Sequence, residues 1–383
     1  MKNILIIAAE NSAENYGSKI LDRFRKSDHK VSFFGIGGDD FKKKGVELIV
    51  HNRELSIIGI VEILSSIMKL RKIMKNLLKS AIRKKTACAI LIDYPDFNLR
   101  LAKKLKKAGI PVYYYISPTV WAWRYSRVNI IRKYVDHIFI IFPFEQKIYE
   151  EEKIPFTYTG HPLISSMVIK TGKNEFRKKH KIRDDDKVLS LLPGSRVSEV
   201  ESLLPEMLKT VKLLRSRIDL KVFILKAENI NPGLFEKIIE RSGEKVDIIN
   251  QNDRYDLFNA SDTALASCGT SNLELAIYSL PFVAVYRVNK LSYLLGKRFL
   301  KISLYSIVNI LLKKNVVEEY IQNRFTAHNC AKAVNSLLKD PGKSKDQISE
   351  FQDLKKMLSL ESPPSTIIFN KIISDIFKDG HTP

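Results

Sequence analysis

The sequence contains very little cysteine. Its three cysteines, Cys88, Cys268 and Cys330, lie far apart and form no Cys-x-x-Cys pair. An odd and widely spaced set of cysteines is typical of a protein in a reducing compartment, and it predicts neither structural disulfides nor a zinc site. We therefore expect a cytoplasmic protein without a metal site.

Long apolar runs are also missing. The first ten residues, MKNILIIAAE, hold one short apolar stretch that stops at Glu10, with no cleavage-site pattern, and no later segment has the character of a stop-transfer sequence. We interpret this stretch as a first strand and not as a signal peptide. No Gly-x-Gly-x-x-Gly follows it, so the sequence does not indicate a nicotinamide or flavin cofactor, and we expect none.

Positive charge is in large excess. Sixty-four Lys and Arg stand against 42 Asp and Glu, which gives a net charge of +22 over 383 residues. Such an excess favours nucleic acid, an anionic membrane surface or a phosphorylated substrate as partner. We expect no nucleic acid, because the aromatic residues do not alternate with a basic stripe and no recognised binding module is present. The length and the 45% hydrophobic content predict two domains.

The chain is organised around Val188 to Glu201, VLSLLPGSRVSEVE, which predicts a buried strand, a turn and a helix. Ser198 and Glu201 have the spacing of a capping box for that helix. Gly194-Ser195-Arg196 then lies between the carboxyl end of a strand and the amino end of a helix. Free N–H groups and the Arg196 fork bind an anion such as a diphosphate at such a point. An ordinary turn with a solvated arginine is the alternative.

Earlier in the chain, Ile4 to Ala8 predicts strand one, followed by a loop from Glu10 to Asn15 and a helix from about Gly17. Val31 to Phe34 predicts a second strand. The next residues, Gly35-Ile36-Gly37-Gly38, predict a loop after that strand, which we interpret as a plain turn in preference to a binding site.

A third strand, Ala87 to Ile92, runs directly into DYPDFN. Because parallel strands place ligands at their carboxyl ends, Asp93 is positioned by its strand to act as a general base. Asp96 and Asn98 either contribute to the same site or cap the following helix, Leu99 to Lys107.

Both tryptophans of the chain fall in one loop, SPTVWAWR, after the predicted strand Val112 to Ile116. Large aromatic side chains at this edge of the sheet either line an acyl or sugar pocket or cover the sheet. Further on, GHPL contains His161, and a lone histidine is more often structural than catalytic.

The segment Leu55 to Lys85 combines a broad apolar face with lysines and arginines towards its end. One interpretation is a helix that packs on the core and has a soluble basic end. The other is contact with an anionic membrane surface, where each nearby Lys or Arg contributes about 1 kcal/mol. Both are compatible with one long segment.

In the second half, SCGTSNLE forms another glycine-containing loop that enters a helix. We expect Ser267, Gly269 and Thr270 to lie beside the first anion loop and to share a diphosphate with it. Glu274, one turn into the helix, either accepts hydrogen bonds from ribose hydroxyls or only complements the helix dipole. A later strand, Phe282 to Val285, ends at Tyr286-Arg287, a third candidate contact.

These patterns predict the α/β class, with two Rossmann-like, doubly wound parallel-sheet domains that face a cleft. We expect an N-terminal acceptor-binding domain over 1–165, a charged linker over 166–187 and a UDP-sugar-binding domain over 188–360. A C-terminal helix over 361–383 packs back on the first domain or on a partner. Asp184, Asp185 and Asp186 in the linker predict a solvated turn and no metal.

The combination resembles the lipid-A-disaccharide synthase family of GT-B glycosyltransferases. The resemblance rests on LLPGSR followed by Glu199, and on SCGTSNLE, IDYPDFN, SPTVWAWR, IGIVEIL and GHPL in this order over nearly the whole chain. It implies an inverting transfer from UDP-2,3-diacylglucosamine to the 6-hydroxyl of 2,3-diacylglucosamine 1-phosphate, with release of UDP. It also implies that the protein associates peripherally with the anionic inner-membrane surface through Leu55 to Lys85, and that a homodimer is possible.

The resemblance implies roles for individual residues. Asp93 is the candidate catalytic base, with Glu10 as second catalytic residue, and Arg196 binds the UDP phosphates. Substrate contacts are expected from Ser12, Asp96, Asn98, Trp123, Arg124 and His161. UDP contacts are expected from Gly194, Ser195, Arg196, Ser267, Gly269, Thr270, Glu274, Tyr286, Arg287, Asn309, Glu319 and Gln322.

One segment departs from the family pattern. The first loop of the family reads Gly-Glu-x-Ser-Gly-Asp, whereas here it is Ala9-Glu10-Asn11-Ser12-Ala13-Glu14. Glu10 and Ser12 are retained, but alanines replace both glycines, which disfavours close backbone approach to the acceptor. The alternatives to the synthase are another UDP-GlcNAc-using GT-B enzyme, either a transferase or a 2-epimerase, and a non-catalytic membrane-surface protein.

Overall fold

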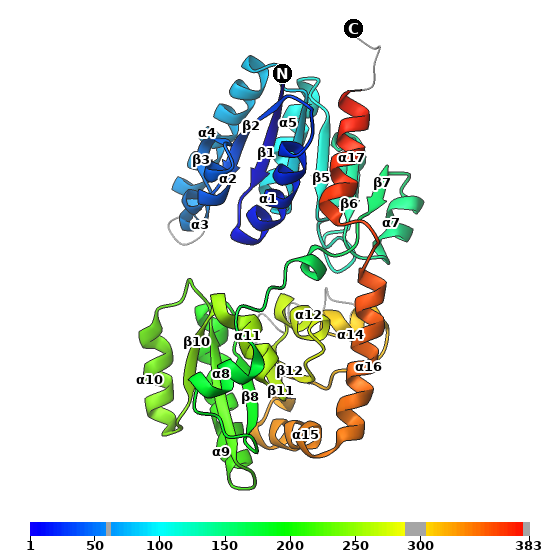
Figure 1. Cartoon of the computed structure of the whole chain (residues 1–383). Helices are drawn as coiled ribbons and strands as arrows, with labels where there is room; N and C mark the ends of the chain where they lie inside the picture. The colour runs from blue at the N-terminus through cyan, green and yellow to red at the C-terminus, as the bar shows by residue number, and fades with distance from the viewer. Residues whose placement is uncertain (59–62, 288–303, 378–383) are drawn as a thin grey trace. The chain divides into compact units, whose positions relative to one another are not determined.

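The computed structural model describes residues 1–58, 63–287 and 304–377. The chain divides into two compact units (Figure 1). The N-terminal unit is Met1–Pro162 together with Leu358–Pro383, and the C-terminal unit is Leu163–Met357. Each unit is built on one parallel sheet, so the predicted pair of doubly wound parallel-sheet domains is confirmed.

The sheet of the N-terminal unit has seven strands in the order β3-β2-β1-β4-β5-β6-β7. From β1 the successive strands β2 and β3 extend the sheet to one side, and from β4 the successive strands extend it to the other side. The strand order therefore reverses between β1 and β4. Its strands are β1 (Lys2–Ala8), β2 (Val31–Gly37), β3 (Glu47–His51), β4 (Cys88–Ile92), β5 (Val112–Tyr115), β6 (His137–Ile140) and β7 (Phe156–Tyr158). All five residues of β4 are fully buried, as expected of a strand covered on both faces.

The helices of this unit cover both faces of the sheet (Figure 1). They are α1 (Asn11–Arg25), α2 (Asp39–Lys43), α3 (Arg53–Ile58), α4 (Ile63–Arg83), α5 (Pro95–Lys107), α6 (Arg127–Tyr134), α7 (Glu145–Glu151) and α17 (Pro364–Ile376). Side chains of α4, α5 and α6 share one core with the strands. On the other face α17 packs against α1, where the rings of Phe24 and Phe369 meet edge to face at 4.9 Å. The last helix therefore belongs to the N-terminal unit.

The predicted loop from Glu10 to Asn15 is wrong, because α1 already begins at Asn11. Ala13 is buried, and the Glu14 carboxylate accepts hydrogen bonds from the Phe41 amide at 2.9 Å and from Asn52 Nδ2 at 3.0 Å. These buried contacts anchor the first turn of the helix. Of the two alanines that replace the family glycines, Ala13 thus occupies a regular helix, whereas Ala9 lies between the end of β1 and the N-cap Glu10.

The predicted loop from Gly35 to Gly38 is also mostly wrong, since β2 continues through Gly37. Gly35 has a φ of +147° and lies so close to β1 that an added Cβ would overlap the carbonyl oxygen of Ile6. The pairing of β2 with β3 shifts register at the same point. A glycine here therefore permits close strand approach and an unusual backbone angle within the sheet.

The basic segment from Leu55 to Lys85 forms α3 and α4, and its part at 59–62 lies outside the described residues. Ile73, Met74, Leu77 and Ala81 of α4 are buried in the core. The charged side chains of the same helix are exposed, among them Arg71, Lys72, Lys75, Lys79 and Arg83. The interpretation of a core-packed helix with a basic outer face is confirmed for this part. In the described portion of the chain, no helix has the length and apolarity needed to cross a membrane.

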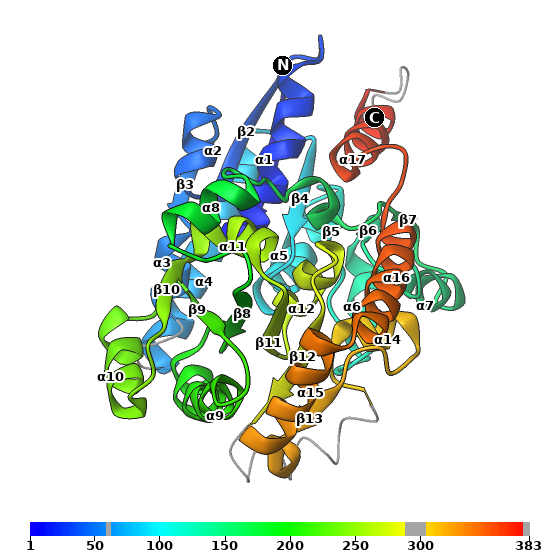
Figure 2. The same cartoon turned by 60° about the horizontal axis from the view of Figure 1, so that its bottom comes forward.

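The sheet of the C-terminal unit has six strands in the order β10-β9-β8-β11-β12-β13 (Figure 2). In this sheet the strand order reverses between β8 and β11. The strands are β8 (Lys187–Leu192), β9 (Leu220–Lys226), β10 (Asp247–Asn250), β11 (Thr263–Ser267), β12 (Phe282–Tyr286) and β13 (Glu319–Ile321). The helices are α8 (Lys173–Lys179), α9 (Val197–Arg215), α10 (Pro232–Ser242), α11 (Arg254–Ala260), α12 (Thr270–Ile277), α14 (Ile307–Leu312), α15 (Ala327–Lys339) and α16 (Pro341–Leu358).

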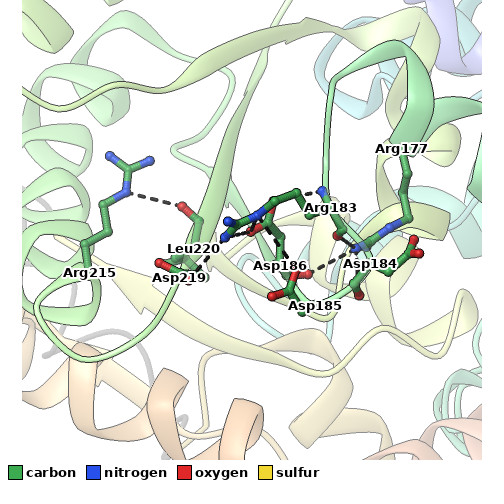
Figure 3. A network of polar contacts seen from close by, with 8 residues as sticks. All are labelled: Arg177, Arg183, Asp184, Asp185, Asp186, Arg215, Asp219 and Leu220. Carbon is green, nitrogen blue, oxygen red and sulfur yellow. Dashed lines mark hydrogen bonds and ion pairs between the residues drawn. The ribbon is translucent and has the colours of Figure 1, made fainter.

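The segment 166–187 contains α8, whose Phe176 is buried against Phe223 of β9 with ring centroids 5.7 Å apart. Its three aspartates belong to a network of arginine contacts (Figure 3). Arg183 donates to Asp186 Oδ1 at 2.8 and 3.0 Å, and to Asp219 Oδ2 at 3.1 Å. These carboxylates therefore organise the turn before β8. No group of three or more His, Cys, Asp and Glu side chains in the described ranges is arranged to hold a metal ion.

The position of Gly35 leads to a stability prediction. We expect Gly35→Ala to lower the free energy of unfolding by roughly 1 to 3 kcal/mol, because the new methyl group overlaps the neighbouring strand. Chemical denaturation measures the change. Gly172→Ala is the control, since an added Cβ at Gly172 meets nothing within 4 Å. Equal stabilities of the two variants would contradict the prediction.

Candidate functional site

The first group of candidate residues follows two neighbouring strands of the N-terminal unit. Ala8 at the end of β1 pairs with Ile92 at the end of β4, and the strand order reverses between these strands. Ligands of doubly wound sheets bind at such a reversal, beyond the carboxyl ends of the strands. Glu10 and Asp93 come directly after the two strands, so the topology places both carboxylates at this point.

The backbone of Asp93 has an unusual conformation. Asp93 and Tyr94 both lie in the left-handed region, with φ values of +50° and +47°. Three hydrogen bonds hold the segment: the Asp93 amide donates to the Tyr115 carbonyl at 2.8 Å, and the Asp93 carbonyl accepts from Asn98 Nδ2 and from the Tyr114 hydroxyl, both at 2.6 Å. Strained residues held so firmly are typical of functional sites.

The Asp93 carboxyl group also has an altered acidity. Burial, and then the negative charge of Glu10, raise its pKa to about 6, while the backbone N–H of Tyr94 acts in the opposite direction. The group is therefore mostly ionised at neutral pH and still basic enough to take a proton. The pKa of Asp93 is higher in the folded protein than in the unfolded chain, so the protonated group stabilises the fold. This contribution to the free energy of unfolding is present in acid and is lost as the pH rises through about 6.

The neighbouring residues have distinct roles. Glu10 and Ser12 are exposed, at the N-cap and in the first turn of α1. Asn98 is buried, and its Nδ2 holds the end of β4 through the Ile92 and Asp93 carbonyls instead of capping α5. His161 is also buried, which lowers its pKa to about 3, and its ring lies 5.3 Å from that of Phe142. The imidazole is therefore neutral at physiological pH.

A charged cluster lies at the adjacent carboxyl end of β5. Asp96 Oδ1 accepts from Arg124 at 3.1 Å and from Arg127 at 2.7 Å. Both guanidinium groups also lie over the ring of Trp123, at 4.3 and 5.1 Å from its centroid. Asp96, Trp123 and Arg124 were predicted from the sequence. Arg127 was missed, although its spacing of three residues from Arg124 at the start of a helix was a usable signal.

The second group of candidate residues follows β8 and β11 of the C-terminal unit, at the reversal of its strand order. Gly194 has a φ of +113°. The Glu199 carboxylate accepts the amides of Ser195 at 3.0 Å and Arg196 at 3.3 Å, and it pairs with the Arg196 guanidinium at 3.0 Å. The predicted capping pair of Ser198 and Glu201 is wrong: α9 begins at Val197, so the reciprocal acidic residue is Glu199.

The loop after β11 lies beside this turn because β8 and β11 are paired. Asn272 Nδ2 donates to the Ser267 carbonyl at 2.9 Å and so fixes the start of α12. Gly269 and Thr270 are exposed, and an added Cβ at Gly269 would meet nothing within 4 Å. The loop thus presents open backbone beside the first turn.

Further residues border these two loops. Tyr286 at the end of β12 has a raised pKa, chiefly because of burial and then because of Glu199. Arg287 donates to the Phe325 carbonyl at 2.6 Å. On the other side, Asn229 Nδ2 donates to the Ser195 carbonyl at 3.1 Å. Sequence reasoning missed Asn229, because it lies three residues beyond β9 without a recognisable motif.

Glu274 is buried and already engaged. It accepts a hydrogen bond from the Tyr255 hydroxyl at 3.0 Å and lies 3.3 Å from Arg254 Nε. Burial raises its pKa, while Arg254 opposes this change. Its position one turn into α12 is as predicted, but its carboxylate points to partners on α11.

Asn309 and Glu319 form a network of their own. Asn309 Nδ2 donates to Glu319 Oε1 at 2.8 Å, and Glu319 accepts the amides of Tyr305 and Ser306 at 3.0 and 2.8 Å. These bonds join α14 to β13. Gln322 follows β13 with a φ of +54°.

Two doubly wound parallel sheets, each with polar loops at its strand reversal, define the GT-B class of sugar-nucleotide enzymes. A glycosyltransferase from Rickettsia africae has this fold, with a TM-score of 0.61, 12% identity and coverage of 99% of both chains. UDP-GlcNAc 2-epimerase from Neisseria meningitidis, solved with UDP-GlcNAc, gives 0.65 at 14% identity and covers 98% of this chain and 100% of its own.

The sequence comparisons identify the family. The model of lipid-A-disaccharide synthetase matches residues 4–371. The lipid-A-disaccharide synthase of Myxococcus xanthus is 37% identical over 332 residues, which are 86% of each chain. The chain belongs to the lipid-A-disaccharide synthetase family, as the sequence motifs indicated.

The electrostatic interaction between Glu10 and Asp93 can be tested directly. We expect Glu10→Gln to lower the pKa of Asp93 from about 6, because the variant removes a negative charge that disfavours ionisation. Carboxyl titration by NMR measures the shift. Glu151→Gln, which removes an exposed charge from α7, is the control and leaves the Asp93 pKa in place. An unchanged Asp93 pKa in Glu10→Gln would show that the two groups do not interact.

Proposed function

We propose that this protein condenses UDP-2,3-diacylglucosamine with 2,3-diacylglucosamine 1-phosphate to form the β-1,6-linked lipid A disaccharide 1-phosphate and UDP. The observation that carries the proposal is Asp93: a carboxylate with a pKa of about 6 on a firmly held backbone, at the strand reversal of a chain that belongs to the family. The epimerase of the same fold, solved with UDP-GlcNAc, supports a UDP-sugar donor.

The donor is assigned to the C-terminal unit. The turn Gly194-Ser195-Arg196 and the open loop at Gly269 and Thr270 lead into the amino ends of α9 and α12. Both helix ends carry partial positive charge, and Arg196 adds a full charge. The amides of Ser195 and Arg196 donate hydrogen bonds to the Glu199 carboxylate. A diphosphate that binds these amides must displace the carboxylate.

The acceptor is assigned to the N-terminal unit, next to Asp93. In the reaction, the Asp93 carboxylate removes the proton from the 6-hydroxyl while this oxygen forms a bond to C1 of the donor sugar. The bond from C1 to the diphosphate oxygen breaks on the opposite face, so the configuration inverts, and UDP leaves with the electron pair. Arg196 and the two helix ends stabilise the charge on the departing UDP.

We further propose that α4 brings the protein to an anionic membrane, where both acylated substrates reside. Its exposed side includes Lys72, Lys75 and Lys79, together with Ile82 and with Met68, which is 71% exposed. Basic and apolar side chains on one outer face are suited to the headgroup layer of an anionic leaflet.

The catalytic assignment predicts the behaviour of Asp93→Asn. With both diacylated substrates in non-ionic detergent, the wild-type protein is expected to release UDP and disaccharide in equal amounts, and its kcat/KM to fall as the pH drops below about 6. We expect the variant to lose ~10²- to 10⁴-fold in kcat, because it lacks the base, with UDP affinity unchanged.

Asp40→Asn is the control, since Asp40 is exposed on α2. Normal turnover of Asp93→Asn would remove Asp93 from the role of base. Consumption of UDP-GlcNAc by epimerisation or hydrolysis, without disaccharide from the diacylated substrates, would contradict the proposed function itself.

The donor assignment predicts that Arg196→Ala weakens UDP binding by roughly 1.5 to 3 kcal/mol, the usual contribution of a hydrogen bond to a charged group. Isothermal titration calorimetry with UDP measures the change. Arg217→Ala removes an exposed arginine beyond the far end of α9 and should bind UDP normally. If Arg196→Ala matched this control, the diphosphate would not lie at the turn after β8.

A further inference from the structure

The cluster of Asp96, Trp123, Arg124 and Arg127 carries more positive than negative charge. In the part of the chain that the structure describes, Asp96 is the one carboxylate in ion-pair contact with either guanidinium. Two arginines therefore share one carboxylate oxygen. Arg127 is only 7% exposed, whereas Asp96 is 66% exposed, so a largely buried cation has a solvent-facing counter-ion. A buried guanidinium without full neutralisation is unfavourable unless a second anion completes it.

The arrangement is held in place by its surroundings. Arg127 is the first residue of α6, and Arg124 precedes it in a left-handed conformation, with a φ of +52°. Both guanidinium groups lie over the indole ring of Trp123. This ring is itself held by a hydrogen bond that its Nε1 donates to Thr119 Oγ1 at 3.2 Å. Stacking on an indole orients a guanidinium and leaves its N–H edge free to bind.

The cluster is close to the proposed base. β4 and β5 are paired up to Ile92 and Tyr115, and Asp96 lies three residues beyond Asp93. Tyr114 connects the two groups: its hydroxyl donates to the Asp93 carbonyl at 2.6 Å, and its raised pKa reflects burial first and Asp93 next, with Arg127 acting in the opposite direction. The excess positive charge thus lies beside Asp93 without contacting its carboxylate.

We propose that Arg124 and Arg127 bind the phosphate group of the acceptor and so select an acceptor that carries one. This inference rests on the proposed function. The acceptor has its phosphate on C1 and its reacting hydroxyl on C6, and these carbons are separated by C5 and the ring oxygen. It therefore requires a base and, close to it, a separate cation pair. A phosphate monoester carries up to two negative charges and matches the planar fork of arginine. Asp96, exposed and singly charged, holds the two forks in position until the phosphate binds.

The test compares two acceptors, 2,3-diacylglucosamine 1-phosphate and 2,3-diacylglucosamine without phosphate, in micelles of non-ionic detergent. We expect wild-type protein to prefer the first by roughly 10- to 100-fold in KM, the factor that a charge-assisted hydrogen bond provides. Arg127→Ala should lose this preference and keep its kcat/KM for the phosphate-free acceptor. Arg127→Lys should keep part of the preference, because it retains the charge but lacks the fork.

Lys133→Ala is the matched control, because it removes an exposed cation from the same helix. If Arg127→Ala is inactive with both acceptors, Arg124→Ala provides the test. The Arg124 side chain is 53% exposed, so the fold tolerates its removal. A full preference for the phosphorylated acceptor in Arg124→Ala would overturn the proposal. Equal use of both acceptors by wild-type protein would also overturn it, whereas disaccharide from neither acceptor would refute the proposed function.

A phosphate in a lipid headgroup has the same chemistry as that of the acceptor. Flotation with vesicles of anionic phospholipid distinguishes the two sources. Weaker flotation of Arg127→Ala combined with an unchanged acceptor preference would assign the arginines to the membrane and overturn the proposal. Unchanged flotation with a lost acceptor preference supports it.

Discussion

The reversal of strand order in a parallel sheet is the constraint on which both candidate sites depend. All strands of such a sheet end at the same edge, and at the reversal the connections on the two sides leave in opposite directions, so the loops there do not cover each other. The reversal falls between β1 and β4 in one unit and between β8 and β11 in the other. The proposed acid–base residues follow the first pair of strands, and the glycine-containing turns follow the second. Under the proposed function, one sheet provides the base and the other binds the donor.

The proposed acid–base site is unfavourable for the fold in several respects. Two consecutive non-glycine residues, Asp93 and Tyr94, adopt left-handed angles, and the negative charge of Glu10 adds to the rise in the pKa of Asp93 that burial causes. The surrounding bonds from Tyr114, Tyr115 and Asn98 compensate for this strain by fixing the segment. A fold under selection for stability alone would place an uncharged residue here. The retention of these costs at one point is what a catalytic role explains.

The sequence predicted the architecture well because buried parallel strands such as β4 and β8 are continuous apolar runs, and because Gly-containing turns mark where they end. It placed Asp93 and Arg196 at the carboxyl ends of these strands, because Asp93 directly follows β4 and Arg196 lies in the glycine-containing turn after β8. Helix starts were harder: α1 begins early because of buried contacts of Glu14, which join residues far apart in the chain. Gly35 was assigned to a loop because the sequence does not show that the neighbouring strand leaves no room for a side chain at this position. Asn229 was missed because only a tertiary contact distinguishes it from other surface residues, whereas Arg127 had a signal in its spacing from Arg124 that was not used.

The carboxylate of Glu199 gives the turn after β8 a built-in competitor. Being tethered four residues away, it meets the Ser195 amide at an effective concentration on the order of millimolar or higher. A free phosphate ion that binds this turn must displace the carboxylate with few contacts of its own. In the proposed donor site, a nucleotide has its base and ribose as additional points of attachment, and these offset the exchange. The tethered acid would then select against small anions and for the whole nucleotide.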